Sequence, residues 1–169
     1  VTTAQKLMGE RFFLEMADHP EFVHEFLDWI VESYILLARH FAELVNLPIT
    51  SVHIGDCSAC MIGGEQFSEF DREPCAKLIR ELGPGRLHSC GDSNHLLEAF
   101  HEVPGIGILN VGTNTSVAKA RAVFGREVTL DVMPDPKVFC FGKPDECAAW
   151  VGQCVEENQG GPLEFQYHL

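Results

Sequence analysis

The apolar residues near the start of the chain follow a helical repeat. Between residues 10 and 46 they recur at three- and four-residue steps, which is typical of amphipathic helices. Pro20 divides this region, because proline fits the first turn of a helix but not its interior; Asp18 is the expected N-cap, and Pro20 and Glu21 open the second helix. Over about seven turns, this helix is expected to bury one broad apolar face, which comprises Phe22, Val23, Phe26, Leu27, Ile30, Tyr34, Leu37, Ala38, Phe41, Leu44 and Val45.

After Pro48 the pattern changes to short β-prone runs that alternate with helical stretches, which is typical of βαβ units and a parallel sheet. The chain has 169 residues, enough for one domain with its own core. We therefore expect a single domain over residues 1–169, with a helical lead-in at 1–48 and alternating β/α units at 49–169. The expected strands are 50–55, 86–89, 107–111, 128–132 and 163–167, and the expected helices lie near 65–82, 94–102, 116–124 and 145–157.

The ends of the expected strands carry polar side chains, many of them of metal-ligand types. Five strands with a helix after each of the first four fit half of an eight-stranded barrel or a small open sheet, and periodicity alone does not decide between the two. In a barrel the carboxyl ends of the strands converge on one face, where such enzymes hold their active sites. The strand-end residues are Asp56, His88, Cys90, 110–113, Asp131 and His168.

His88 and Cys90 are the sharpest candidate site. Side chains alternate along a strand, so these two point to the same side, and a nitrogen and a thiolate together suit zinc. Two candidates exist for a third ligand. His168, at the end of the last strand, is preferred because barrel closure brings it near the other strand ends. The alternative is the Cys57-x-x-Cys60 pair, which follows the preceding strand.

Composition and charge argue against some classes of partner and indicate the cellular compartment of the protein. The formal net charge is −13 and the few Lys and Arg residues do not cluster, which argues against nucleic acid as a partner. No basic amphipathic helix, secretion signal or membrane-length apolar run is present in the sequence, so no membrane partner is expected. The seven cysteines are an odd number, which favours reduced thiols and a cytoplasmic protein.

Two further stretches extend the pattern around the His-x-Cys pair. The residues at 55–91 read GDCSACMIGGEQFSEFDREPCAKLIRELGPGRLHSCG, and those at 124–139 read FGREVTLDVMPDPKVF. Together they resemble the uroporphyrinogen decarboxylase superfamily, and the His-x-Cys-Gly strand end is similar to its zinc-containing, cobalamin-dependent methyltransferase branch. The earlier stretch LMGERFFLEMADHPEFVHEFLDWIVESY fits the family's long helical segment. The resemblance implies an α/β fold: the C-terminal part, about five strands, of a TIM (β/α)8 barrel.

The resemblance also implies site residues. His88 and Cys90 match two zinc ligands of the methyltransferase branch, and the third, a cysteine in the family, falls at or near His168, which is a departure from the family pattern. Asp56 corresponds to a polar residue that faces the pocket, so Asp56, or His53 nearby, is a candidate to orient the site or act as a base.

The implied activity is a zinc-dependent methyltransferase that moves a methyl group between a corrinoid, carried on a partner protein, and a small-molecule thiol or a methoxy- or methylamine-type substrate. One alternative is uroporphyrinogen III decarboxylase. Another is a non-catalytic, truncated half-barrel that binds metal or a partner chain. Because five strands do not close a barrel that needs eight, a homodimer or a tightly associated second chain is also expected.

Overall fold

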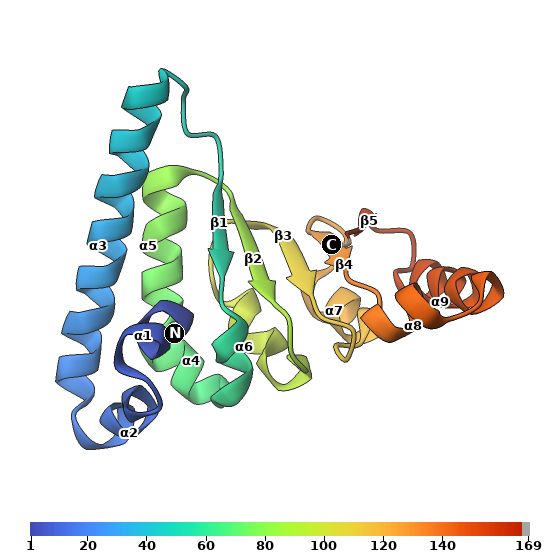
Figure 1. The fold of residues 1–169 in the computed structure, drawn as a ribbon, viewed down its shortest axis with the longest axis horizontal. Helices are drawn as coiled ribbons and strands as arrows, with labels where there is room; N and C mark the ends of the chain where they lie inside the picture. Colours follow the sequence, from blue (N-terminus) through green and yellow to red (C-terminus); the bar gives the residue numbers. More distant parts are fainter. Residues whose placement is uncertain (167–169) are drawn as a thin grey trace.

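The computed structural model describes residues 1–166 of the protein (Figure 1). Its helices are α1 (Thr2–Met8), α2 (Arg11–Asp18), α3 (Pro20–Val45), α4 (Gly64–Phe70), α5 (Arg72–Leu82), α6 (Leu97–His101), α7 (Val117–Phe124), α8 (Pro136–Phe141) and α9 (Pro144–Glu157), with short 3-10 helices η1 (Cys57–Met61) and η2 (Asn94–Leu96). The strands are β1 (Val52–Gly55), β2 (Gly85–Ser89), β3 (Ile106–Val111), β4 (Thr129–Val132) and β5 (Leu163–Phe165).

The strands form one parallel sheet in the order β1-β2-β3-β4-β5, which confirms the five expected strands within a few residues at each end. Each strand lies beside the next one in the sequence, and no crossover reverses the order. Doubly wound sheets contain such a reversal, whereas barrels do not, because successive connections in one direction place every helix on the same side. The topology therefore matches part of a barrel (Figure 1).

The two faces of the sheet differ in chemistry. Side chains such as Leu87, Leu109 and Leu130 point to the helix-covered side and are fully buried in the main core. The alternate positions face the other side and are largely polar: Gly55, His88, Asn110 and Asp131 lie side by side in the register of β1 to β4. In a barrel this second face is the interior, so the polar row lines the region where such enzymes bind substrates.

Helix α3 departs from expectation at its start. Asp18 is not the N-cap of α3: it is the last residue of α2, and His19 is the N-cap. Proline disfavours the helical conformation of the residue before it, so His19 leaves the helical region and Asp18 completes the preceding helix. The expectation that Pro20 opens the helix is confirmed.

The expected apolar face of α3 is only partly buried. Val23 and Leu27 are buried as expected, together with Val31 and Ile35, in a stripe narrower than the expected face. Helix α3 packs against α5, and its last turns project past the end of α5 (Figure 1). At about 39 Å for 26 residues, α3 is more than twice as long as α5, which has 11 residues. The expected face residues that are exposed instead are Phe22, Tyr34, Leu37, Phe41, Leu44 and Val45.

Two helices have no counterpart in the sequence pattern. Helix α1 has 7 residues and buries only Ala4, and α8 has 6 residues and buries none, so neither shows an apolar repeat. The stretch expected as one helix at 65–82 is two, α4 and α5, which meet at Asp71. Among the helices of residues 1–166, none combines the length and the apolarity that a membrane span requires.

Candidate metal centre

Cys57, His88 and Cys90 meet at the carboxyl ends of β1 and β2. Their ligand atoms, two sulfurs and one ring nitrogen, all lie within 4.8 Å of one another. The register of the sheet explains the meeting, because Gly55 pairs with His88 and each chain then runs on by two residues, to Cys57 and Cys90. Two neighbouring parallel strands thus bring thiols from two separate loops to one imidazole.

The segment around Cys90 is shaped to present these side chains. Ser89 points to the opposite side, where it is fully buried and its hydroxyl pairs with that of Ser93 at 2.7 Å. Gly91 follows, and an added Cβ there would lie 2.7 Å from the Cys60 sulfur, a contact too close for any side chain. Glycine at position 91 therefore lets the two thiol-bearing loops pack together.

The neighbouring thiols of this centre make it harder for the Cys90 thiol to lose its proton. Partial desolvation of the thiol of Cys90, an exposed residue, raises its pKa to about 11, with further contributions from a hydrogen bond to Cys57 and from the charges of Cys57 and Cys60. A thiolate pair needs a neighbouring cation to form, and a bound metal ion supplies that charge while the thiols release protons. The arrangement suits a cation-binding site.

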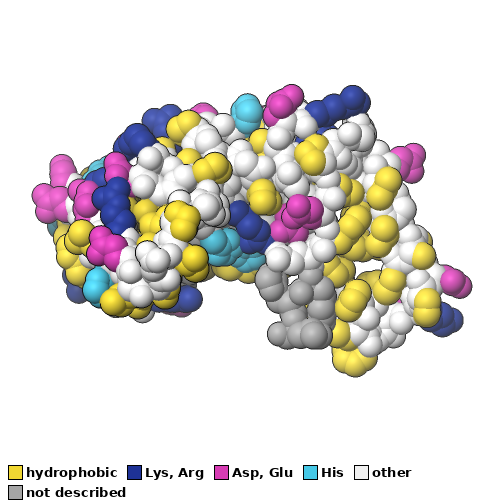
Figure 2. All heavy atoms as spheres, turned by 90° about the horizontal axis from the view of Figure 1, so that it is seen from above, with side chains coloured by type: hydrophobic (Ala, Val, Ile, Leu, Met, Phe, Trp, Pro, Cys, Tyr) yellow, Lys and Arg dark blue, Asp and Glu magenta, His cyan; other side chains and the backbone are white. Residues whose placement is uncertain are grey.

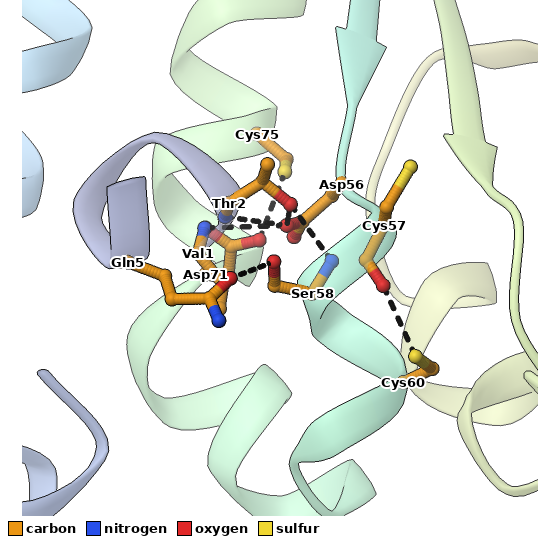
Figure 3. Close-up of polar contacts among 9 residues, drawn as sticks. All are labelled: Val1, Thr2, Gln5, Asp56, Cys57, Ser58, Cys60, Asp71 and Cys75. Carbon is orange, nitrogen blue, oxygen red and sulfur yellow. Dashed lines mark hydrogen bonds and ion pairs between the residues drawn. The ribbon is translucent and has the colours of Figure 1, made fainter. Parts of the chain in front are cut away.

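Cys60, part of the alternative ligand pair, lies outside this group of ligand atoms. Its thiol donates a hydrogen bond to the main-chain oxygen of Cys57 at 3.0 Å, which closes the turn of η1 (Figure 3). The preferred third ligand, His168, lies outside the described residues. Within residues 1–166, the third ligand atom beside His88 and Cys90 belongs to Cys57.

Asp56, the candidate base or orienting group, points away from Cys57 (Figure 3). Its Oδ1 accepts hydrogen bonds from the main-chain nitrogen of Thr2 at 2.8 Å and the Thr2 hydroxyl at 2.9 Å. Asp56 is 2% exposed, and α1 covers its carboxylate. A direct role at the metal-ligand atoms stays a prediction, and the contacts seen here are those of a residue that anchors α1 to the end of β1.

A second buried carboxyl, Asp71, lies in the same cluster as Asp56 (Figure 3). Its Oδ1 accepts from the Val1 nitrogen at 3.1 Å, and its Oδ2 faces the Cys75 thiol at 3.7 Å. Burial raises the pKa of Asp71 to about 8, and the Asp56 carboxylate adds to the rise. Two carboxyls this close do not both ionise readily, so Asp71 holds the proton and Asp56 the charge.

Replacing Asp71 with asparagine is expected to stabilise the fold relative to the wild type, and more so at pH 8.5 than at pH 5.5. Because the folded-state pKa of Asp71 is raised, the folded state binds more protons than the unfolded state between about pH 4 and pH 8, and wild-type stability falls as pH rises through that window. Asparagine cannot ionise and escapes this loss. Urea unfolding at both pH values measures the free energy of unfolding, and Glu69→Gln, at an exposed position, is the control. If Asp71→Asn differs from the wild type by the same free energy at pH 5.5 and pH 8.5, the prediction is wrong.

A polar network extends from His88 across the inner face of the sheet. His88 Nδ1 contacts Asn110 Oδ1, and Asn110 Nδ2 donates to the main-chain oxygen of Asp131 at 2.9 Å. Arg86 donates to Asp131 Oδ2 at 2.5 Å and to His53 Nδ1 at 3.0 Å. Figure 2 shows histidine, basic and acidic side chains gathered near the middle of one face of the molecule.

The sequence reasoning placed Asn110 and Asp131 among the strand ends but gave neither a partner, and it passed over Arg86. A signal was available: Arg86 and His88 are two apart on one strand, so they share a face. His53, the other candidate for orienting the site, lies on this face beside His88, with ring centroids 6.0 Å apart.

Comparison with known proteins gives the fold a context. A family model described as uroporphyrinogen decarboxylase (URO-D) matches residues 1–165. A solved structure of a methyltransferase from Methanosarcina mazei is similar, with a TM-score of 0.77 and 20% sequence identity, over 97% of this chain and 49% of that chain. At this identity the likeness shows the fold, and the chain spans about half the length of that structure. No curated protein matches the chain.

Proposed function

The chain belongs to the uroporphyrinogen decarboxylase family, and on that premise we propose that it carries the metal site of a zinc-dependent methyltransferase. The reaction moves a methyl group between a corrinoid and a thiol, or a methoxy- or methylamine-type substrate. One observation carries the proposal: the ligand atoms of Cys57, His88 and Cys90 lie within 4.8 Å of one another at the strand ends, where barrel enzymes hold their active sites.

The donor set fits zinc. One ring nitrogen and two sulfurs are ligands that zinc accepts, whereas magnesium and calcium take oxygen. Zinc bonds of about 2.0–2.3 Å place tetrahedral ligand atoms roughly 3.5–3.8 Å apart, so a spacing within 4.8 Å needs only a small closing movement. Three protein ligands leave the fourth position for a substrate, as in catalytic sites. When bound, zinc lowers the pKa of a substrate thiol.

In the thiol reaction, the substrate sulfur loses its proton to solvent and attacks the methyl carbon of a methylated corrinoid. The sulfur–carbon bond forms as the carbon–cobalt bond breaks, and the electron pair of the broken bond stays on cobalt. Cys57, His88 and Cys90 would hold the zinc ion to which the thiol binds, and His53, beside His88, would border the bound thiol on the polar face. A separate corrinoid protein is the proposed methyl carrier.

Closure of the barrel is part of the same proposal. Strands β1 and β5 each have one neighbour among the described strands, and a barrel of this type needs eight. Further strands, from the same polypeptide, a second copy or another chain, are proposed to pair with these edges. They also cover the polar face and complete the substrate pocket.

Metal analysis combined with a methyl-transfer assay tests the function. Full-length protein purified without chelators is expected to hold stoichiometric zinc and to consume methylcobalamin in the presence of a small thiol, followed by the loss of the alkyl-cobalt absorbance. His88→Ala and Cys90→Ala are expected to lose both properties. Cys154→Ala, which removes a buried thiol on α9, is the matched control and keeps both. Stoichiometric zinc without methyl transfer involving any thiol, methoxy compound or methylamine, or full activity in Cys90→Ala, would contradict the proposal.

A further inference from the structure

We infer that Asn110 is the positioning residue of the metal centre, because it fixes the proton of His88 on Nδ1 and leaves Nε2 as the metal-binding nitrogen. The inference rests on the proposed zinc site and adds to it a residue outside the ligand set. Asn110 lies on β3, one strand away from His88 and level with it in the sheet register. Its side chain is fully buried and directed at the imidazole.

The orientation of the Asn110 amide follows from its other contact. Its Nδ2 lies 2.9 Å from the main-chain oxygen of Asp131, and a carbonyl oxygen only accepts hydrogen bonds. The nitrogen end of the amide must therefore face Asp131, which turns the oxygen end, Oδ1, toward His88. The usual ambiguity between amide nitrogen and oxygen is removed by this carbonyl.

The tautomer of His88 follows in turn. Asn110 Oδ1 is an acceptor, so the His88 Nδ1 that touches it must carry a proton. In the neutral ring the proton is then absent from Nε2, which keeps its lone pair for a metal ion. Metal-bound histidines commonly donate their other ring N–H to an oxygen in this way, and loss of that oxygen typically costs 10–100-fold in metal affinity.

The support of Asn110 extends one step further. Asp131, whose main-chain oxygen binds the Asn110 amide, lies on β4. Its side-chain carboxylate accepts a hydrogen bond from an Arg86 nitrogen at 2.5 Å. Arg86 lies on β2, two residues before His88, so this ion pair ties β2 to β4 across β3, which carries Asn110. The amide is thus held between three strands, and the direction of its oxygen does not depend on a mobile loop.

The tautomer of His88 is tested directly by nitrogen NMR of the metal-free protein labelled at histidine. In the wild type, the neutral ring of His88 is expected to show a protonated Nδ1 and an unprotonated Nε2. In Asn110→Leu, which keeps the volume but removes the acceptor, the population is expected to shift toward the Nε2 proton, and zinc affinity, measured by chelator competition, is expected to fall about 10–100-fold.

Two variants separate this role from general damage. Asn110→Asp keeps an oxygen against Nδ1, and it is expected to retain the wild-type tautomer and a zinc affinity closer to that of the wild type than Asn110→Leu shows. Asn158→Leu removes another buried asparagine that bonds through both ends of its amide, to Arg121 and to the Gly161 oxygen, and is expected to lower stability without changing zinc affinity.

A wild-type His88 protonated on Nε2, or an Asn110→Leu protein that binds zinc as tightly as the wild type, overturns the inference. A wild-type protein with the Nδ1 proton but no zinc affinity overturns the proposed function and leaves the tautomer assignment standing.

Discussion

Replacing Cys57 with alanine is expected to lower the zinc affinity of the protein by more than about 100-fold, the upper range seen when only a supporting group of a metal ligand is lost. The reason is geometric, because the Cys57 sulfur and the ligand atoms of His88 and Cys90 all lie within 4.8 Å of one another. Removing it leaves two protein ligands for a metal that needs at least three. Chelator competition, and cobalt(II) substitution with its sulfur-to-cobalt absorption, measure the loss.

The controls for this prediction lie in the same loop and at the chain's end. Cys60→Ala removes a thiol that bonds to the Cys57 oxygen rather than joining the ligand group, and it is expected to keep zinc within a few-fold of the wild type. His168→Ala is expected to keep zinc as well, since Cys57, His88 and Cys90 supply the three proposed ligands. If His168→Ala loses zinc and Cys57→Ala keeps it, the third ligand is His168 and the assignment of Cys57 is wrong.

Most of the fold could be predicted from local pattern. The change from a three- and four-residue repeat to short β-prone runs after Pro48 placed all five strands, because period is a property of the sequence alone. The prediction that was wrong in part concerned which residues of α3 are buried. The face of α3 that ends in Phe41 and Leu44 has the right spacing to be buried, but whether a partner element reaches that far depends on the length of α5, which spacing does not report.

The site could be predicted in part for a similar reason. His88 and Cys90 are separated by one residue on a strand, so their common direction is a local property. Cys57 meets them only because β1 pairs with β2 at a particular register, Gly55 against His88. A one-residue shift would turn the strand's side chains to the other face. Register is fixed by the packing of the whole sheet, so the sequence left two alternatives for the third ligand, the preferred His168 and the Cys57-x-x-Cys60 pair.

Arg121 of α7 is a buried charged residue, some of whose partners are also far from it in the sequence. It lies where α7 meets the segment before β4 and the turn before β5. Its guanidinium donates to Asn158 Oδ1 from Nε at 3.0 Å and from Nη2 at 2.7 Å. It also donates to the main-chain oxygens of Gly125, of Val128 at 2.9 Å and of Pro162 at 2.9 Å. Arg121 is 3% exposed, so these bonds are sheltered from water, and they tie α7 to the turn that leads into β5.

Replacing Arg121 with methionine is expected to reduce the free energy of unfolding by about 3–5 kcal/mol, since hydrogen bonds to a charged group are worth about 1.5–3 kcal/mol each and the loss leaves buried carbonyls without a donor. Urea unfolding measures the change, and Arg126→Met, at an exposed position nearby, is the control with an effect within about 0.5 kcal/mol. Hydrogen exchange is expected to accelerate first in β5, because the Pro162 oxygen that Arg121 holds also accepts from the Leu130 nitrogen at the junction with β4. A loss below about 1 kcal/mol, or exchange that accelerates evenly along the sheet, would show that the guanidinium does not anchor this strand.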